Sequence, residues 1–355
     1  MDNRNMINRV FSQKILHQIA IKNKSDVVDE AYDFYIQGPK NINVIQKMKS
    51  LYNYLKKSYR NEYFYKNTML NKLLLGRHSV NTTTALSEMP IGKSIADFIL
   101  LNGKGVVYEI KTELDKLDRL DNQINDYYEV FNYVVVITND KHLNKVMARY
   151  KDTTVGILVL TSRNTLSEVQ KPKENNSLLN TKAMYNFLRK EERKRVIAQN
   201  HMDVPTYNDF TEYDVLFDVF KEIPMTKLHN NMISELKKRG NMKEYKDEFL
   251  AAPTEIKFLL YFAKMTRKIK INYIIFLRRI NMYYPYLRGK QNELFAIKEL
   301  LEKGLIGDCI QPIIEPIKYT TTFKNTLQYC GEKAFSINLV VNSKLTEEEI
   351  SNETV

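Results

Sequence analysis

The chain has 355 residues, of which 43% are hydrophobic and 27% are charged, a composition typical of globular rather than disordered proteins. Its 54 lysines and arginines exceed its 42 aspartates and glutamates, and the net charge of +12 favours a polyanionic partner such as nucleic acid. Its 2 cysteines are too few for a disulfide framework or a four-sulfur zinc site. With no signal segment and no apolar run long enough for a membrane helix, we expect a cytoplasmic protein that does not enter a membrane.

The first part of the chain has a helical pattern. Residues 1–57 carry apolar side chains at three- and four-residue spacing, with a break at Gly38 and Pro39. A further helix is predicted over residues 61–75, and Gly76 suits the left-handed position that often follows a helix.

Between residues 82 and 161 the chain alternates between strand and helix patterns. The predicted strands are residues 82–89, 94–101, 106–112, 133–138 and 155–161. The predicted helices between them are residues 117–131 and 142–150. This order predicts an α/β core with a crossover connection, in which a mixed sheet is flanked by helices.

The sequence pattern changes several times in the rest of the chain. Residues 163–181 are polar and contain Pro172, which indicates a linker or a long surface loop. Residues 182–281 predict a basic helical region, and residues 282–341 predict a small α/β segment. The acidic tail, residues 342–355, is predicted to be disordered.

One hairpin of the predicted core carries a pattern with chemical meaning. Side chains alternate along a strand, so Glu109 and Lys111 project to the same face. The turn at residues 102–105 would bring Asp97 beside Glu109. Two carboxylates and the backbone carbonyl of Ile110 would then offer the oxygen ligands that Mg²⁺ or Mn²⁺ prefers.

Such a site suits phosphodiester hydrolysis. The ion would activate a water, and Lys111 would orient that water or stabilise the transition state. In the alternative interpretation, Asp97 and Glu109 are ordinary exposed hairpin positions and Lys111 is a cross-strand salt partner.

The segment resembles the PD-(D/E)XK nuclease superfamily, because its acids lie on successive strands of an α/β core with a helix on either side. The resemblance places Glu62 where many members carry an additional acid, although an acid at a helix N-terminus is also favoured by the helix dipole. It matches Gln123 and Tyr127 to the Gln-xxx-Tyr signature of exonuclease-like members. Ala96 departs from the pattern, which often has proline there.

More narrowly, residues 50–280 resemble an uncharacterised bacterial family of restriction-like nucleases, with the nuclease-like domain at residues 58–162. Members are commonly encoded beside a phage beta-type partner, and residues 282–341 look like the first part of that partner fused to the nuclease. This association implies a role in mobile elements or anti-phage defence.

The best candidate for a nucleic-acid-binding strip is the basic segment from residue 264 to 290, where tyrosines interleave with cations. Its central cations are Arg267, Lys268, Lys270, Arg278 and Arg279. A solvated helix face is the alternative. Elsewhere, Arg77 and His78 precede the first strand and would either approach a substrate phosphate or have a structural role.

The sequence therefore predicts a Mg²⁺- or Mn²⁺-dependent nuclease that acts on nucleic acid, with DNA as the expected form. The alternatives are a catalytically silent nucleic-acid-binding or regulatory module with a nuclease fold, and a structural adaptor.

Overall fold

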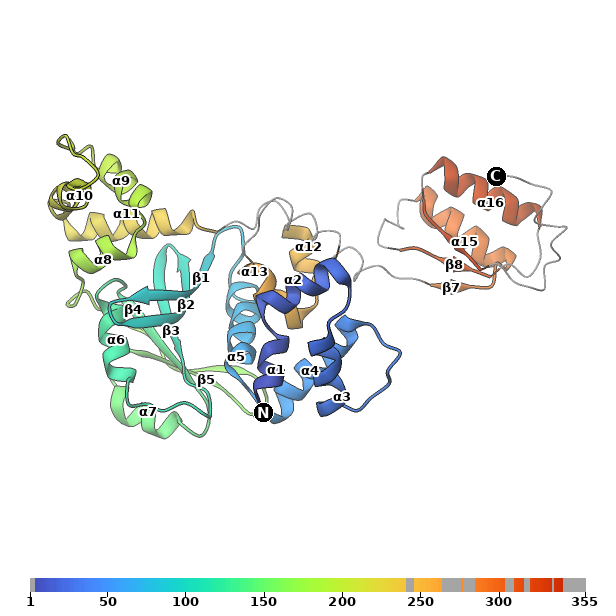
Figure 1. Ribbon diagram of the computed structural model, residues 1–355, viewed down its shortest axis with the longest axis horizontal. Coiled ribbons are helices and arrows are strands. Elements are labelled where there is room, and N and C mark those ends of the chain that lie inside the picture. The colour runs from blue at the N-terminus through green and yellow to red at the C-terminus, as the bar shows by residue number, and fades with distance from the viewer. Residues whose placement is uncertain are drawn as a thin grey trace. The chain divides into compact units, whose positions relative to one another are not determined.

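The computed structural model describes residues 4–240, 246–263, 276, 285–303, 310–315, 320–333 and 335–340 (Figure 1). The chain divides into two compact units, Met1–Met265 and Thr266–Val355. No helix among the described residues is both long enough and apolar enough to span a membrane.

The first unit begins with four helices, α1 (Arg4–Val10), α2 (Gln13–Lys22), α3 (Asp26–Tyr35) and α4 (Val44–Ser58). Side-chain caps fix two of their starts. The Ser12 hydroxyl accepts the Ile15 N–H before α2, and Asn43 forms a capping box with Gln46 before α4. The predicted helices and the break at Gly38 and Pro39 are confirmed.

Helix α5 (Glu62–Met69) is capped by Asn61 and runs directly into a π-helical turn, η1 (Leu70–Leu74). The prediction of a helix here is confirmed, but the conformation expected for Gly76 is wrong, because this glycine does not have a positive φ. Glycine is required there for another reason. A Cβ at Gly76 would lie 2.6 Å from the Lys72 carbonyl oxygen, so only a residue without a side chain allows this close approach.

The core of this unit is one mixed sheet of six strands in sequence order. Its strands are β1 (Thr84–Ile91), β2 (Ser94–Asn102), β3 (Lys104–Ile110), β4 (Tyr133–Thr138), β5 (Gly156–Leu160) and β6 (Leu166–Gln170). The first three strands form an antiparallel meander, β3, β4 and β5 are parallel, and β6 is antiparallel to β5. Helices α6 (Leu120–Tyr128) and α7 (Leu143–Tyr150) form the two crossovers (Figure 1). The predicted α/β core is confirmed.

Strand β6 corrects the interpretation of residues 163–181 as a linker or surface loop. The chain turns back after β5, where Thr161 and Thr165 pair through backbone and hydroxyl groups. β6 then pairs with β5 at the edge of the sheet. Its side chains are mostly exposed, so it lacks the apolar alternation by which strands are recognised in a sequence.

The helices that follow are α8 (Thr181–Phe187), α9 (Lys190–Gln199), α10 (Glu212–Lys221), α11 (Met225–Lys237), α12 (Lys246–Ala251) and α13 (Lys257–Tyr261). They confirm the predicted helical region as far as residue 263. Helix α11 packs closely on β3, because a Cβ at Gly105 would lie 2.5 Å from Phe131 and 2.7 Å from Ile233.

In the second unit, the described residues form a parallel sheet in the order β7 (Tyr286–Leu287), β8 (Ile313–Ile314), β9 (Asn338–Leu339). Helices α15 (Gln291–Glu302) and α16 (Thr321–Glu332) connect these strands. The predicted alternation of strand and helix is confirmed. The predicted disordered tail lies outside the described residues.

Candidate functional site

The register of the sheet brings three acidic positions level with one another. Phe98 pairs with Tyr108 across β2 and β3, so the next step of the ladder sets Asp97 opposite Glu109. Asp97 Oδ2 accepts the N–H of Ile110 at 2.8 Å. On the other side of β2, the pairing with β1 sets Glu88 opposite Asp97.

Glu88 has an unusual backbone for a strand residue. Its φ is +54°, in the left-handed region, whereas Ser87 and Met89 on either side keep their pairing with β2. The Ser87 hydroxyl also donates to the Asp97 carbonyl at 2.9 Å. A non-glycine residue held in this region indicates local strain, which often accompanies function.

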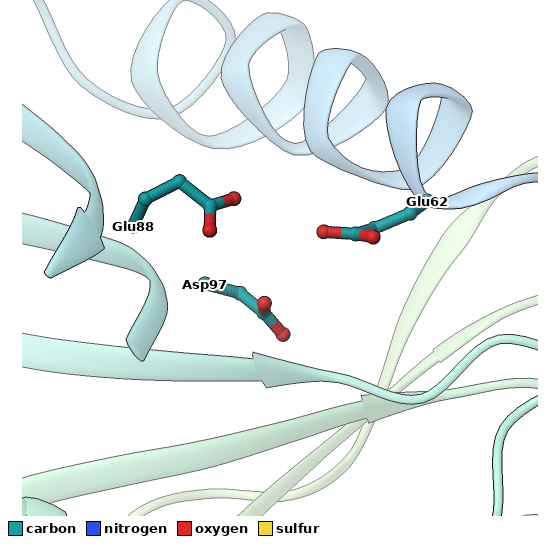
Figure 2. A group of neighbouring side chains, drawn as sticks. All are labelled: Glu62, Glu88 and Asp97. Carbon is teal, nitrogen blue, oxygen red and sulfur yellow. The ribbon is translucent and has the colours of Figure 1, made fainter. Parts of the chain in front are cut away.

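Three carboxylates converge here, one each from α5, β1 and β2. One oxygen from each of Glu62, Glu88 and Asp97 lies within 4.8 Å of the other two, and Figure 2 shows the side chains pointing toward one another. The Lys66 ammonium forms ion pairs with Glu62 and Glu88 and lies 3.9 Å from Asp97. Three carboxyl groups therefore face one ammonium group.

Glu109 belongs to a neighbouring group rather than to these three carboxylates. Its side chain is 2% exposed, and Oε1 lies 2.7 Å from Lys111 Nζ and 2.6 Å from Gln123 Nε2. Oε2 lies 2.6 Å from the Tyr127 hydroxyl. Lys111 also donates to Gln123 Oε1 at 2.8 Å. Gln123 and Tyr127 stand one turn apart on α6, as their spacing predicts.

These positions exclude the alternative that Asp97 and Glu109 are ordinary exposed hairpin residues, because side-chain exposure is only 18% for Asp97 and 2% for Glu109. Burial and the neighbouring Glu109 charge raise the pKa of Asp97 to about 7, against the opposing effect of Lys66. Burial, followed by the Glu109 charge, raises the pKa of Tyr127 far above its usual range. Tyr127 therefore stays a hydrogen-bond donor.

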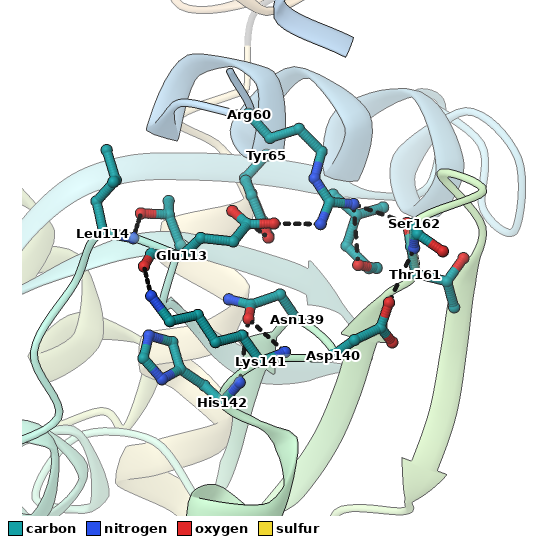
Figure 3. A network of polar contacts seen from close by, with 12 residues as sticks. Arg60, Tyr65, Glu113, Leu114, Asn139, Asp140, Lys141, His142, Thr161 and Ser162 are labelled. Atoms are coloured by element: carbon teal, nitrogen blue, oxygen red, sulfur yellow. Dashed lines mark hydrogen bonds and ion pairs between the residues drawn. The ribbon is translucent and has the colours of Figure 1, made fainter. Parts of the chain in front are cut away.

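A polar network holds the chain that follows Lys111 (Figure 3). The Asn139 side chain donates to the Lys111 carbonyl at 3.0 Å, and Lys111 N–H donates to the Ile137 carbonyl at 2.8 Å. Arg60, just before α5, pairs with Glu113 and donates to the Thr161 carbonyl at 2.7 Å. These contacts tie the start of α5 to the ends of β3 and β5. They therefore hold Glu62, at the start of α5, in place relative to the carboxylates on the strands.

A groove of about 700 Å³ adjoins the carboxylates. Its lining includes Glu62, Lys66 and Glu88, the loop after β3, and residues from the N-terminal helices such as Asn8 and Ser12. Lys66, Glu88 and the N-terminal wall were all missed by reasoning from sequence. Only their assembly in space connects them with Asp97, and a positive φ at a glutamate has no sequence signature.

The nucleic-acid-binding residues predicted in the basic strip lie outside the described residues. They are Arg267, Lys268, Lys270, Arg278 and Arg279. His78 is described, and its Nδ1 lies 3.1 Å from Asn102 Nδ2.

Comparison with known proteins places this site within a family. Residues 55–277 match the family model of bacteriophage P4 protein cII. The chain belongs to this family. It is 26% identical over 183 residues to protein cII of Enterobacteria phage P4, in an alignment that covers 50% of this chain and 64% of that protein. The chain therefore spans slightly less than two thirds of the length of this relative.

The region that matches the cII family includes Glu62, Glu88 and Asp97 as well as Glu109 and its partners. It begins after the helices α1 to α3 and most of α4. The name protein cII specifies no activity. No solved structure matches the chain.

Proposed function

We propose that this cII-family protein is a metal-dependent phosphodiesterase that hydrolyses DNA, on a core of the restriction-endonuclease-like, PD-(D/E)XK type. The observation that carries the proposal is the convergence of Glu62, Glu88 and Asp97 beside the buried Glu109–Lys111 pair. Asp97 and the Glu109–Lys111 pair are largely buried charges, which are unfavourable for folding. Their position beside carboxylates that line a groove therefore favours function over structure.

The donor set fits a hard divalent cation. Carboxylate oxygens are the ligands that Mg²⁺ and Mn²⁺ prefer, and three carboxylates against one ammonium leave two negative charges to balance. Without a cation, a nucleic-acid phosphate would be repelled from this part of the groove. When bound, the ion would lower the pKa of a water and neutralise charge on the phosphate.

The chain's own residues supply the remaining chemistry. Asp97 is central, because it lies among the three carboxylates and next to Glu109. Lys111 would orient the attacking water or stabilise negative charge in the transition state. Gln123 and Tyr127 hold the Glu109 carboxylate, and Glu109 in turn fixes the Lys111 ammonium 2.7 Å away. The backbone carbonyl of Ile110 is a further candidate ligand, next to the N–H that binds Asp97.

The test is cleavage of circular, linear and single-stranded DNA and of RNA, with Mg²⁺ or Mn²⁺. We expect metal-dependent cleavage that is lost in Asp97→Asn and Lys111→Met and retained in Asp203→Asn, which changes an exposed carboxylate outside the site. If the wild-type protein cleaves none of these substrates, the proposal is overturned.

The second candidate function is a nucleic-acid-binding or regulatory module that keeps this fold without catalysis. It is favoured by the engagement of both Glu109 oxygens with donors of the chain itself, and by the ammonium of Lys66 among the carboxylates. Equal DNA binding by the wild type and Asp97→Asn, with no cleavage by either, would select this function.

We also propose that residues 282–341 correspond to the start of a beta-type partner and that the protein acts in mobile elements or anti-phage defence. If so, the complete partner should associate with this protein in a pull-down, and Asp97→Asn should abolish phage resistance.

A further inference from the structure

A second hollow lies on the face of the sheet that α6 does not cover. Because side chains alternate along β3, Tyr108 projects away from the face on which Val107 and Glu109 meet α6. It lines a cavity of about 280 Å³ built from β2 to β6 and the segment at Arg77 and His78. This cavity shares no lining residue with the groove beside the carboxylates.

The floor of this cavity is apolar and tightly packed. Leu100, Val135 and Leu158 are each less than 5% exposed, and the Tyr108 ring lies edge-on to Phe98 with ring centroids 6.4 Å apart. A floor of this kind suits a flat, apolar group such as a planar ring.

The Tyr108 hydroxyl is a polar group left for a ligand. The residue is 9% exposed and lines the cavity, and its hydroxyl makes no hydrogen bond within the part of the chain that the structure describes. Burial raises the pKa of Tyr108 to about 12, although nearby Arg77 opposes this effect. The hydroxyl therefore keeps its proton and can donate it. Because the hydroxyl is open to the cavity, a bound acceptor can accept its hydrogen bond.

The rim of the cavity carries charge suited to an anion. Arg77, Lys104 and Lys171 face a single carboxylate, Glu168. None of the four forms an ion pair with a residue that the structure describes. The Lys104 ammonium is held 4.2 Å from the centre of the Tyr133 ring. A ligand with a phosphate at the rim and a ring on the floor would satisfy both parts.

We propose that this cavity binds one nucleotide, either a free mononucleotide or the terminal nucleotide of a strand. The base lies on the floor within reach of Tyr108, and the phosphate is held by Arg77 and Lys171. The small volume favours a single nucleotide over an extended peptide. The proposal does not depend on the nuclease function.

The experiment is calorimetric titration of the full chain in EDTA, which prevents a nucleotide from binding through metal at the carboxylate groove. The ligands are dAMP, deoxyadenosine, inorganic phosphate, a 5′-phosphorylated oligonucleotide and a phosphotyrosine peptide. We expect dAMP to bind more tightly than deoxyadenosine and phosphate. Tighter binding of the oligonucleotide than of dAMP, weakened by Arg77→Ala and Lys171→Ala, would identify a strand end as the source of the nucleotide, and the reverse order would identify the free nucleotide.

Three variants and a matched control sharpen the result. Tyr108→Phe should weaken dAMP binding by about fivefold through loss of one hydrogen bond. Arg77→Ala and Lys171→Ala should each weaken it by about tenfold, whereas Lys145→Ala, on the exposed side of α7, should leave it unchanged. Absence of dAMP binding would overturn the proposal, as would phosphate or the phosphopeptide binding as tightly as dAMP.

Discussion

Lys66 is a cation in the middle of the carboxylates that we propose as a metal site. It is 5% exposed and forms ion pairs with Glu62 and Glu88. A divalent ion bound by the same carboxylates has to compete with this ammonium. Opposite charges about 4 Å apart interact by about 4 kcal/mol at an effective dielectric constant of about 20, so this competition strongly limits the affinity for metal.

We therefore expect Lys66→Met to raise the affinity for Mn²⁺ by at least about tenfold in calorimetric titration. The same variant should melt at a lower temperature in EDTA, because the three carboxylates then repel one another, and Mn²⁺ should restore the melting temperature. Lys145→Met is the control for loss of a charge elsewhere. An unchanged Mn²⁺ affinity in Lys66→Met would mean that metal does not use these carboxylates.

Asp97 gives the protein a dependence of stability on pH. Its pKa is about 7 in the folded protein, against 3.8 for the unperturbed group. Between these values the folded state binds more protons than the unfolded state. The contribution of Asp97 to the free energy of unfolding therefore falls as pH rises from about 4 to 7. Above that range the buried negative charge is a constant destabilising influence.

Asp97→Asn should therefore raise the free energy of unfolding by about 1–3 kcal/mol at pH 8 without metal, and should change it little at pH 4. Urea melts at both pH values measure this difference, with Asp203→Asn as the control. Equal effects at the two pH values would show that Asp97 is not the group responsible. A gain in stability together with a loss of cleavage would be typical of a functional residue.

At the scale of elements, α6 is held on β3 by polar contacts as well as by apolar packing. The Tyr127 hydroxyl lies 2.6 Å from Glu109 Oε2 and 2.9 Å from the Ile95 carbonyl oxygen. It has one proton, so it donates to one of these acceptors at a time. The charged carboxylate is the stronger acceptor.

Tyr127→Phe should lower the free energy of unfolding by about 1–3 kcal/mol, because a buried carboxylate oxygen loses its donor. Denaturant melts should show a smaller effect for Tyr128→Phe, whose hydroxyl lies 3.0 Å from that of Thr154 in a partly exposed position. If both variants had the same stability as the wild type, Tyr127 would not be supporting Glu109.

The contact between β3 and α11 depends on a glycine. Gly105→Ala would place a methyl group within 2.7 Å of Phe131 and Ile233, so it should destabilise the unit by about 1–3 kcal/mol through overpacking. Gly103 is the matched control, because it has open space around it and a φ of +71°. Gly103→Asn keeps a residue that tolerates this φ and should change the melting temperature little. Similar losses in both variants would point to the turn rather than to packing.

The elements differ in how far the sequence predicts them. Period-two alternation was enough to put Lys111 on the same face as Glu109, and the turn at residues 102–105 was enough to place Asp97 beside Glu109, because both depend only on local geometry. The edge strand β6 was missed, since its exposed side chains carry no such period. Glu88 was missed because it faces Asp97 only through the pairing of β1 with β2. Lys66 was missed because its role depends on the packing of α5 against the sheet.

For the whole molecule, the overall positive charge contrasts with the charge at the carboxylate groove. The net charge is +12, yet the carboxylate groove carries an excess of negative charge. Nucleic acid held by this protein without metal must therefore be held mainly elsewhere. The basic segment from residue 264 to 290 is the sequence's best candidate.

This separation leads to a prediction about salt. If the strip contacts phosphates, replacing Arg267, Lys268 and Lys270 together by alanine removes up to three of those contacts. Each phosphate contact with double-stranded DNA contributes about 0.9 to the slope of log K against log salt concentration. The slope measured in EDTA should therefore become shallower by about 2–3 in the triple variant.

The matched control is the alanine replacement of Lys49, Lys56 and Lys57, which removes the same charge from the exposed side of α4. Because long-range attraction depends on net charge in both variants, equal changes in slope would mean that the strip acts only through overall charge. If the slope becomes shallower only in the strip variant, the strip makes direct phosphate contacts. Cleavage of saturating DNA should then persist in the strip variant, since the carboxylates and Lys111 lie in the other unit, whereas Asp97→Asn should lose cleavage and keep the salt dependence of binding.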